Sequence, residues 1–221
     1  KWRQSSVMQH KWRLINGTEL YNIDEDKGQK NNVAEQNPER VKAMRDFYES
    51  WWQQVSVDFD KEIYFKIGSA KENPITLTCH DVHAPNGQQP WNHDYIREGA
   101  KGSGYWSIDI KDEGNYKISL RRYPIESGLA IGGTIPPITP EDVPGLETGL
   151  PEGVNLNYIK ASVSIENQIN KTIDITGSEK SADFDVYLKP GKTKLRASFF
   201  NEAGEENVAY YVYIEKLNVK L

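Results

Sequence analysis

Hydrophobic and polar residues alternate along most of the chain after residue 60. An alternation of period two places every second side chain on one face, as in a half-buried β-strand. The alternating positions are Ile63/Phe65/Ile67, Ile75/Leu77/Cys79, Trp106/Ile108/Ile110, Tyr116/Ile118/Leu120, Ala161/Val163/Ile165, Phe184/Val186/Leu188, Leu195/Ala197/Phe199 and Val208/Tyr210/Val212/Ile214. Residues 60–221 are therefore predicted to form an all-β, jelly-roll-like sandwich with short antiparallel strands.

The first part of the chain follows a different pattern. Two β-type runs, Arg13 to Ile15 and Glu19 to Ile23, flank Asn16-Gly17, which is a strong hairpin signal. Asn37 and Pro38 then have the composition of a helix start. The positions that share one helical stripe are Val41, Met44, Tyr48, Trp51, Trp52 and Val55. Residues 1–58 are therefore predicted to form a small α+β subdomain, an antiparallel sheet with one helix across it.

A long segment rich in Pro, Gly and Thr, residues 132–153, interrupts the alternation. Connections of this length inside a compact domain are either functional loops or surface excursions without a task. The sequence leaves both alternatives open.

Composition excludes several classes of protein. The net charge of −5 disfavours a nucleic-acid partner, because a basic surface normally supplies most of that affinity. No apolar run approaches the roughly 20 residues of a membrane helix, so no membrane partner is expected. The single cysteine, Cys79, cannot form an internal disulfide. The chain opens without Met and without a signal peptide, so we expect a piece of a longer protein.

An ordered series of short motifs resembles one known family. The motifs are Ser6 to Met8, Lys11 to Ile15, Glu19 to Ile23, Gly28 to Ala34, Pro38 to Val41 and Tyr48 to Trp52. Together they resemble the C-terminal subdomain of bacterial sulfatases of the arylsulfatase type. Two positions depart from the family pattern, since Asn22 replaces an Asp and Asp26-Lys27 replaces Asp-Pro. The segments Glu72 to His83 and Arg121 to Pro124 are similar to an extra β-sandwich appended to some sulfatases.

The resemblance implies a partner that this chain lacks. In the family, a small sheet and a helix lean on a large α/β catalytic domain. That domain cleaves sulfate esters with a formylglycine residue and calcium, in the periplasm or outside the cell. The formylglycine comes from a Cys/Ser-x-Pro-x-Arg motif, but Cys79 continues as His80-Asp81-Val82-His83. The chain alone is therefore expected to hold no catalytic residue, no metal and no cofactor.

The richest cluster of reactive side chains lies between Cys79 and Asp94. Cys79, His80, His83 and His93 are residue types that bind zinc, but their spacing matches no standard zinc signature. The alternatives are a loop whose polar groups hold its own conformation, or a surface that contacts a sugar or another substrate.

Aromatic and basic residues give further candidates. Trp91, Trp106 and Tyr105 could stack on a sugar ring, although Trp106 shares its phase with buried positions. Arg97, Arg121 and Arg122 could bind sulfate or carboxylate, or form ordinary ion pairs with Asp and Glu. Trp2, Arg3 and His10 lie nearest the expected catalytic domain. The predicted substrate contacts are Trp2, Arg3, His10, Asp81, His83, Trp91, Asn92 and Arg97.

Three functions remain open at this point. The leading interpretation is an accessory fragment of a sulfatase that contributes interface and cleft wall to the missing catalytic domain. The alternatives are a carbohydrate-binding module for sulfated glycans, and a purely structural docking domain.

Overall fold

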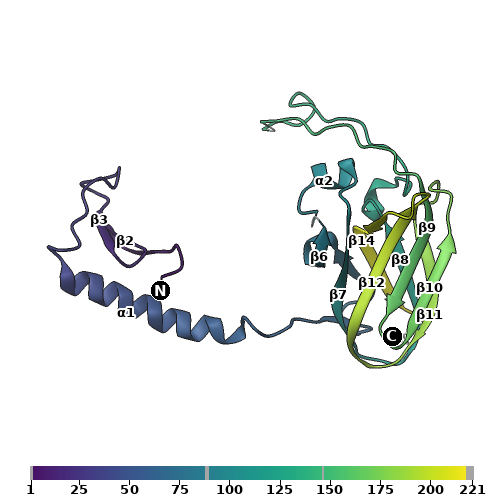
Figure 1. Cartoon of the computed structure of the whole chain (residues 1–221), viewed down its shortest axis with the longest axis horizontal. Helices are drawn as coiled ribbons and strands as arrows, with labels where there is room; N and C mark the ends of the chain where they lie inside the picture. Colours follow the sequence, from purple (N-terminus) through teal and green to yellow (C-terminus); the bar gives the residue numbers. More distant parts are fainter. Residues whose placement is uncertain (1, 88–89, 146, 218–221) are drawn as a thin grey trace. The chain divides into compact units, whose positions relative to one another are not determined.

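The chain folds as two units, residues 1–62 and 63–221 (Figure 1). We describe it from a computed structural model that covers residues 2–87, 90–145 and 147–217. None of the helices within these ranges is long and apolar enough to cross a membrane.

The first unit is a three-stranded sheet with one long helix. Strands β1 (Ser6–Gln9), β2 (Trp12–Ile15) and β3 (Glu19–Asn22) pair antiparallel in that order. Asn16 and Gly17 take positive φ angles of 47° and 70° in the turn between β2 and β3, which explains why Asn-Gly occurs there. Helix α1 (Pro38–Val55) begins at the predicted position and continues into a short 3₁₀ helix, η1 (Ser56–Asp58).

The sheet and the helix share a small apolar core. Val7, Leu14 and Leu20 from the strands pack against Met44 and Tyr48 of α1. Two details differ from the sequence prediction. Trp51 is exposed, because three short strands are too narrow to cover the whole helical stripe. The Asn37 side chain donates to the carbonyl of Val33 at 2.9 Å and does not cap the helix.

The second unit is a sandwich of two sheets. The larger sheet contains β4 (Phe65–Ile67), β6 (His83–Gly87), β7 (Gly102–Ile110), β9 (Tyr158–Ile165), β10 (Ile169–Asp174), β12 (Gly191–Asn201) and β13 (Glu206–Val208). The smaller sheet has the order β11 (Ala182–Leu188), β8 (Gly114–Arg121), β14 (Tyr211–Lys216) and β5 (Ile75–Thr78). The connections include helix α2 (His93–Glu98) and two 3₁₀ turns, η2 (Cys79–Asp81) and η3 (Ile125–Ser127).

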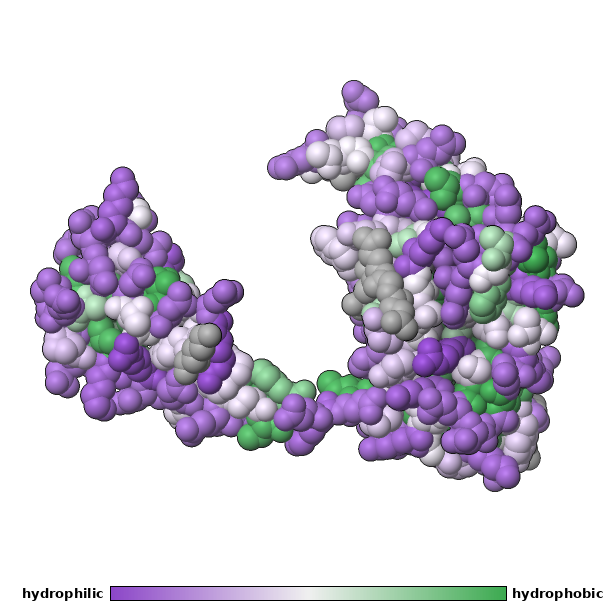
Figure 2. All heavy atoms as spheres, in the orientation of Figure 1, coloured by the Kyte–Doolittle hydropathy of each residue, from purple (hydrophilic) through white to green (hydrophobic). Residues whose placement is uncertain are grey.

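The predicted alternation builds the core between the two sheets. Ile108, Val163 and Leu195 of the larger sheet face Ile118 and Val212 of the smaller one within a single buried cluster. Hydrophilic residues dominate the face of this unit that Figure 2 shows. The sandwich prediction is confirmed. Ile63 is a local exception, because the strand begins only at Phe65 and leaves Ile63 exposed.

The Pro-rich segment 132–153 extends away from the sheets but has internal order (Figure 1). Ile138 and Leu150 exchange two backbone hydrogen bonds of 3.0 and 2.8 Å, so the segment folds back on itself. At its base, the buried Arg97 side chain donates to the carbonyls of Pro136 at 2.8 Å and Pro151 at 2.6 Å. A charged side chain therefore holds the two ends of the excursion together.

Arg122 is the most completely buried charged residue described, with 1% of its surface exposed. Its guanidinium donates to the carbonyls of Gly133 and Val154 at 3.2 and 2.8 Å, and to those of Ile96 and Arg97 at 3.0 and 2.9 Å. Burial lowers the pKa of Arg122, but an arginine starts so high that it keeps its proton. Carbonyl dipoles thus balance the buried charge.

Replacing Arg122 with alanine should destabilise the chain by about 3 kcal/mol or more, because four carbonyls lose a charged donor. Arg122→Lys should recover only part of the loss, since one ammonium cannot reach all four acceptors. Urea denaturation followed by circular dichroism measures both. Exposed Arg196→Ala is the control and should change stability by less than about 0.5 kcal/mol. Equal stability of Arg122→Ala and wild type would contradict the role given to Arg122.

Candidate functional site

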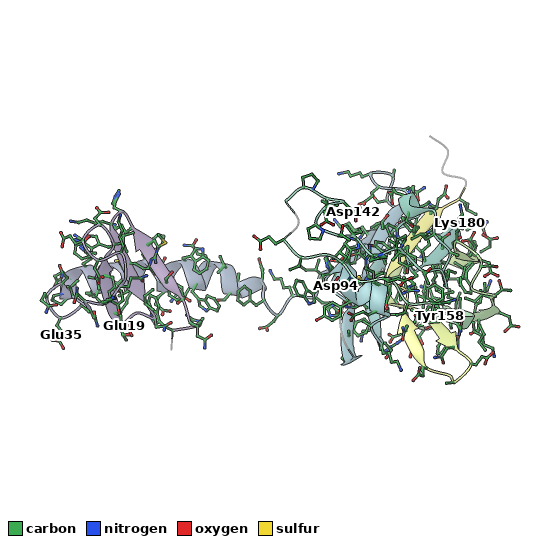
Figure 3. All side chains as sticks on the ribbon, turned by 90° about the horizontal axis from the view of Figure 1, so that it is seen from above. Glu19, Glu35, Asp94, Asp142, Tyr158 and Lys180 are labelled. Carbon is green, nitrogen blue, oxygen red and sulfur yellow. The ribbon has the colours of Figure 1, made fainter. Side chains whose placement is uncertain are left out.

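A hollow of about 160 Å³ opens at one end of the sandwich, beside helix α2. Its lining comes from the end of β5, the turn η2, the segment before α2, α2 itself and the start of β14. The lining residues are Thr78, Cys79, His80, Pro90, Trp91, Asn92, His93, Ile96 and Tyr211. Asp94, labelled in Figure 3, lies in the first turn of α2 and marks this end of the unit.

Local hydrogen bonds fix both sides of the hollow. On one side, the Thr78 hydroxyl donates to Asp81 at 2.9 Å, and the Cys79 amide donates to the carbonyl of Tyr210 at 2.8 Å. These bonds hold the η2 turn that presents His80. On the other side, the Asn92 side chain accepts from the amide of Tyr95 at 3.2 Å and so caps α2. The far end of α2 is held by Arg122 through the carbonyls of Ile96 and Arg97.

Trp91 is the dominant side chain of the hollow. Its indole is 63% exposed, although it is among the largest apolar groups in the chain. A ring nitrogen of His80 donates to the Trp91 carbonyl, which ties the η2 turn to the segment before α2. The Trp91 ring lies 6.2 Å from that of Tyr95 with a tilt of 50°. The backbone around Trp91 is therefore anchored while its ring faces solvent.

Burial affects two titratable groups in the lining, Cys79 and Tyr211. Burial raises the pKa of Cys79 to about 11, so its sulfur remains a thiol near neutral pH. Burial also raises the pKa of Tyr211, whose hydroxyl stays protonated. Over the described ranges, no three His, Cys, Asp or Glu side chains lie close enough to hold a metal ion. His83, one member of the zinc alternative, instead stacks on Tyr105 with ring centroids 4.9 Å apart.

The structure separates the candidate residues predicted in the second unit. Trp91 and Asn92 line the hollow, whereas Asp81 accepts the Thr78 hydroxyl and His83 covers Tyr105. Trp106 is fully buried, and its indole donates to the carbonyl of Thr78 at 2.9 Å. It therefore offers no surface for stacking.

The three arginine candidates lie inside the fold. Arg97 and Arg122 bind backbone carbonyls, and Arg121 donates to the carbonyl of Tyr123 at 3.2 Å. All three are buried and face the protein's own backbone. Among the described residues they form no ion pair with Asp or Glu, and a substrate contact by Arg97 stays a prediction.

The candidates in the first unit take part in its own packing. Trp2 stacks on Tyr48 with ring centroids 4.1 Å apart. The guanidinium of Arg3 lies 3.9 Å from the ring centroid of Trp52. His10 is exposed in the turn between β1 and β2, where its φ angle is 52°. A substrate contact by these residues stays a prediction.

The sequence analysis did not select Tyr211 or Pro90, which also line the hollow. Tyr211 could have been found, because it alternates with the buried Tyr210 and Val212 and must face outward from β14. Its approach to Trp91 depends on the tertiary fold and has no sequence signal.

No protein-family model and no curated protein matches this chain. Similar solved structures include a carbohydrate-binding module, CBM6cm-2, from Cellvibrio mixtus lichenase 5A in complex with cellotriose (12% identity, 66% of this chain, 100% of that one, TM-score 0.33). Another is CBM35 from Cellvibrio japonicus Abf62 (15% identity, 66% of this chain, 99% of that one, TM-score 0.33). A third is a ruminal GH26 endo-beta-1,4-mannanase (14% identity, 72% of this chain, TM-score 0.36).

The chain spans 28% of the length of that mannanase and nearly the whole of the two carbohydrate-binding modules. At these TM-scores the likeness carries no argument about function. The sulfatase resemblance gains no support from these matches and stays a prediction.

Proposed function

We propose that the second unit, residues 63–221, binds carbohydrate at the hollow beside Trp91. The main support for this proposal is the exposed indole of Trp91, which sits on an anchored backbone next to His80, Asn92 and His93. One face of a sugar ring is apolar and packs on an aromatic ring, while its hydroxyl groups exchange hydrogen bonds with polar side chains. A large exposed apolar group beside polar groups meets both requirements.

The shape and chemistry of the hollow favour binding over cleavage. Its volume of about 160 Å³ is small beside the roughly 300–1,000 Å³ of typical enclosed ligand pockets. Such a hollow would contact one sugar unit of a chain at the surface. Hydrolysis of glycosides normally needs two carboxylates, and none of the described lining residues carries one. The proposed activity is therefore recognition without turnover.

The similar structures include carbohydrate-binding modules, and the proposal agrees with them in kind. It rests on the residues around Trp91 and not on that likeness. A module of this kind would hold an attached catalytic domain near its polysaccharide, in the periplasm or outside the cell.

Trp91→Ala should weaken carbohydrate binding by about 2 kcal/mol, roughly thirtyfold, because a central aromatic contact is lost. Electrophoresis through gels containing galactomannan, xylan, laminarin or hydroxyethyl cellulose measures the retardation. Trp51→Ala is the matched control, since Trp51 is also exposed but belongs to the first unit. Wild-type chain that no gel retards, or equal losses in both variants, would contradict the proposal.

A second candidate function concerns the first unit and keeps the sulfatase interpretation. Met8 and Phe47 are exposed, and both line two hollows of about 150 and 550 Å³ between β1 and α1. The larger hollow also reaches Trp51 and Trp52. A unit of this size is only marginally stable alone, because it buries a small share of its surface, and covering an exposed apolar face would stabilise it. We call the two hollows together the β1–α1 groove, and we propose that a sulfatase catalytic domain covers it.

Met8→Asp should weaken binding to an arylsulfatase catalytic domain from which the enzyme's own C-terminal subdomain has been removed. The expected loss is about tenfold or more, because a charge would enter the apolar groove. Biolayer interferometry measures the complex, and Val57→Asp, exposed outside the groove, is the control. Absence of a complex with wild-type chain, or the same loss in the control, would reject the docking role.

A further inference from the structure

Three basic residues form a row on the outer face of the larger sheet. Lys192, Lys194 and Arg196 alternate along β12 with residues such as Leu195 and Ala197, which point into the core. Side chains two residues apart on a strand share a face, so the row spans roughly 13 Å. We call these three residues the β12 stripe.

Aromatic rings hold the β12 stripe in place. The ammonium of Lys192 lies 4.6 Å from the ring centroid of Tyr64. The ammonium of Lys194 and the guanidinium of Arg196 lie 4.5 and 5.7 Å from that of Tyr105. A ring face attracts a cation through its quadrupole but carries no net charge. The cations are therefore positioned without being neutralised.

Carboxylates do not cancel this charge. Within residues 2–87, 90–145 and 147–217, no carboxylate lies within 4.0 Å of a stripe cation. Asp109 stands opposite Lys192 in the strand register but pairs with Lys111, and Glu206 accepts the Ser198 hydroxyl. Glu166 follows β9 beside Lys194 but makes no ion pair with it. The stripe is a locally positive surface on a chain of net charge −5.

We propose that the β12 stripe binds the sulfate or carboxylate groups of an acidic glycan. This rests on the proposed carbohydrate-binding function and assigns the anion contacts to residues outside the Trp91 hollow. Guanidinium and ammonium groups donate charge-assisted hydrogen bonds to both kinds of anion. Register places Ser164 of β9 opposite Arg196, so this residue lies beside the stripe for contacts with the sugar. The Ser162 hydroxyl is already bonded to the Lys171 carbonyl and to Thr172.

The same observations disfavour a nucleic acid as the partner. Single-stranded nucleic acids bind through open aromatic faces on which bases stack, in addition to basic grooves. Tyr105 offers no such platform, because His83 stacks on it at 18° and the two cations approach it as well. Beyond the stripe, the chain's excess of acidic residues would repel a long phosphate backbone.

The test compares two triple variants of the same charge. Lys192→Gln/Lys194→Gln/Arg196→Gln removes the stripe, and Lys71→Gln/Lys101→Gln/Lys180→Gln removes three exposed cations elsewhere in the unit. Both are run through gels containing dextran, dextran sulfate or carboxymethyl-dextran. The stripe variant should lose roughly tenfold in affinity for the charged polymers, and the control should resemble wild type. Preference between the two charged polymers identifies sulfate or carboxylate as the ligand group.

Several outcomes would overturn the proposal. The first is that neither charged dextran retards the wild-type chain. The second is that the two variants lose the same affinity for the charged dextrans. The third is that a single-stranded oligonucleotide binds as tightly as the charged dextrans do. The binding of uncharged galactomannan separates this proposal from the Trp91 site, because the stripe variant should retain that binding while Trp91→Ala loses it. A stripe variant that lost both activities and its circular dichroism spectrum would be replaced by the single change Arg196→Gln, judged by the same outcomes.

Discussion

The bonds from the Arg122 guanidinium to backbone carbonyls fix the end of the sandwich on which the proposed site depends. Two of its acceptors, Ile96 and Arg97, are the last-turn carbonyls of α2, which a helix leaves without internal partners. Two others, Gly133 and Val154, belong to the flanks of the Pro-rich excursion. One buried charge therefore satisfies acceptors from three segments that regular strand pairing does not reach. The helix held in this way carries Asn92 at its start, and Trp91 directly before it.

This arrangement divides the second unit into two kinds of surface. The hollow beside Trp91 offers a ring face and polar side chains, and the η2 turn on one side of it is bonded to the Tyr210 carbonyl just before β14. The β12 stripe lies on the larger sheet and offers positive charge held over tyrosine rings. In the proposed function, Trp91 recognises a sugar ring by stacking, whereas the cations recognise its acidic substituents. A glycan that engages both surfaces gains avidity from the second contact.

The sequence predicted the elements that show a repeating hydrophobic pattern. It did not predict features that depend on a single tertiary contact. The alternation at Leu195 and Ala197 predicted a core strand because burial recurs at every second residue. Helix α2 was missed because six residues are too few to show a helical period. Arg97 was placed at a surface because charged residues are usually exposed, and only the fold brings Pro136 and Pro151 to it. Trp91 was selected as a stacking candidate, and the fold leaves its side chain exposed. The β12 stripe was not selected, because the outward positions of any half-buried strand are polar.

The most direct test of the account is the chemical shift of the Trp91 indole N–H during titration with cello- or manno-oligosaccharides, followed by ¹H–¹⁵N correlation spectra. The account predicts that the Trp91 resonance, assigned by its disappearance in Trp91→Ala, moves with saturating dependence on ligand. The buried Trp106 indole, bonded to the carbonyl of Thr78, should stay in place. Movement of the Trp51 or Trp52 resonances with a stationary Trp91 would contradict the account.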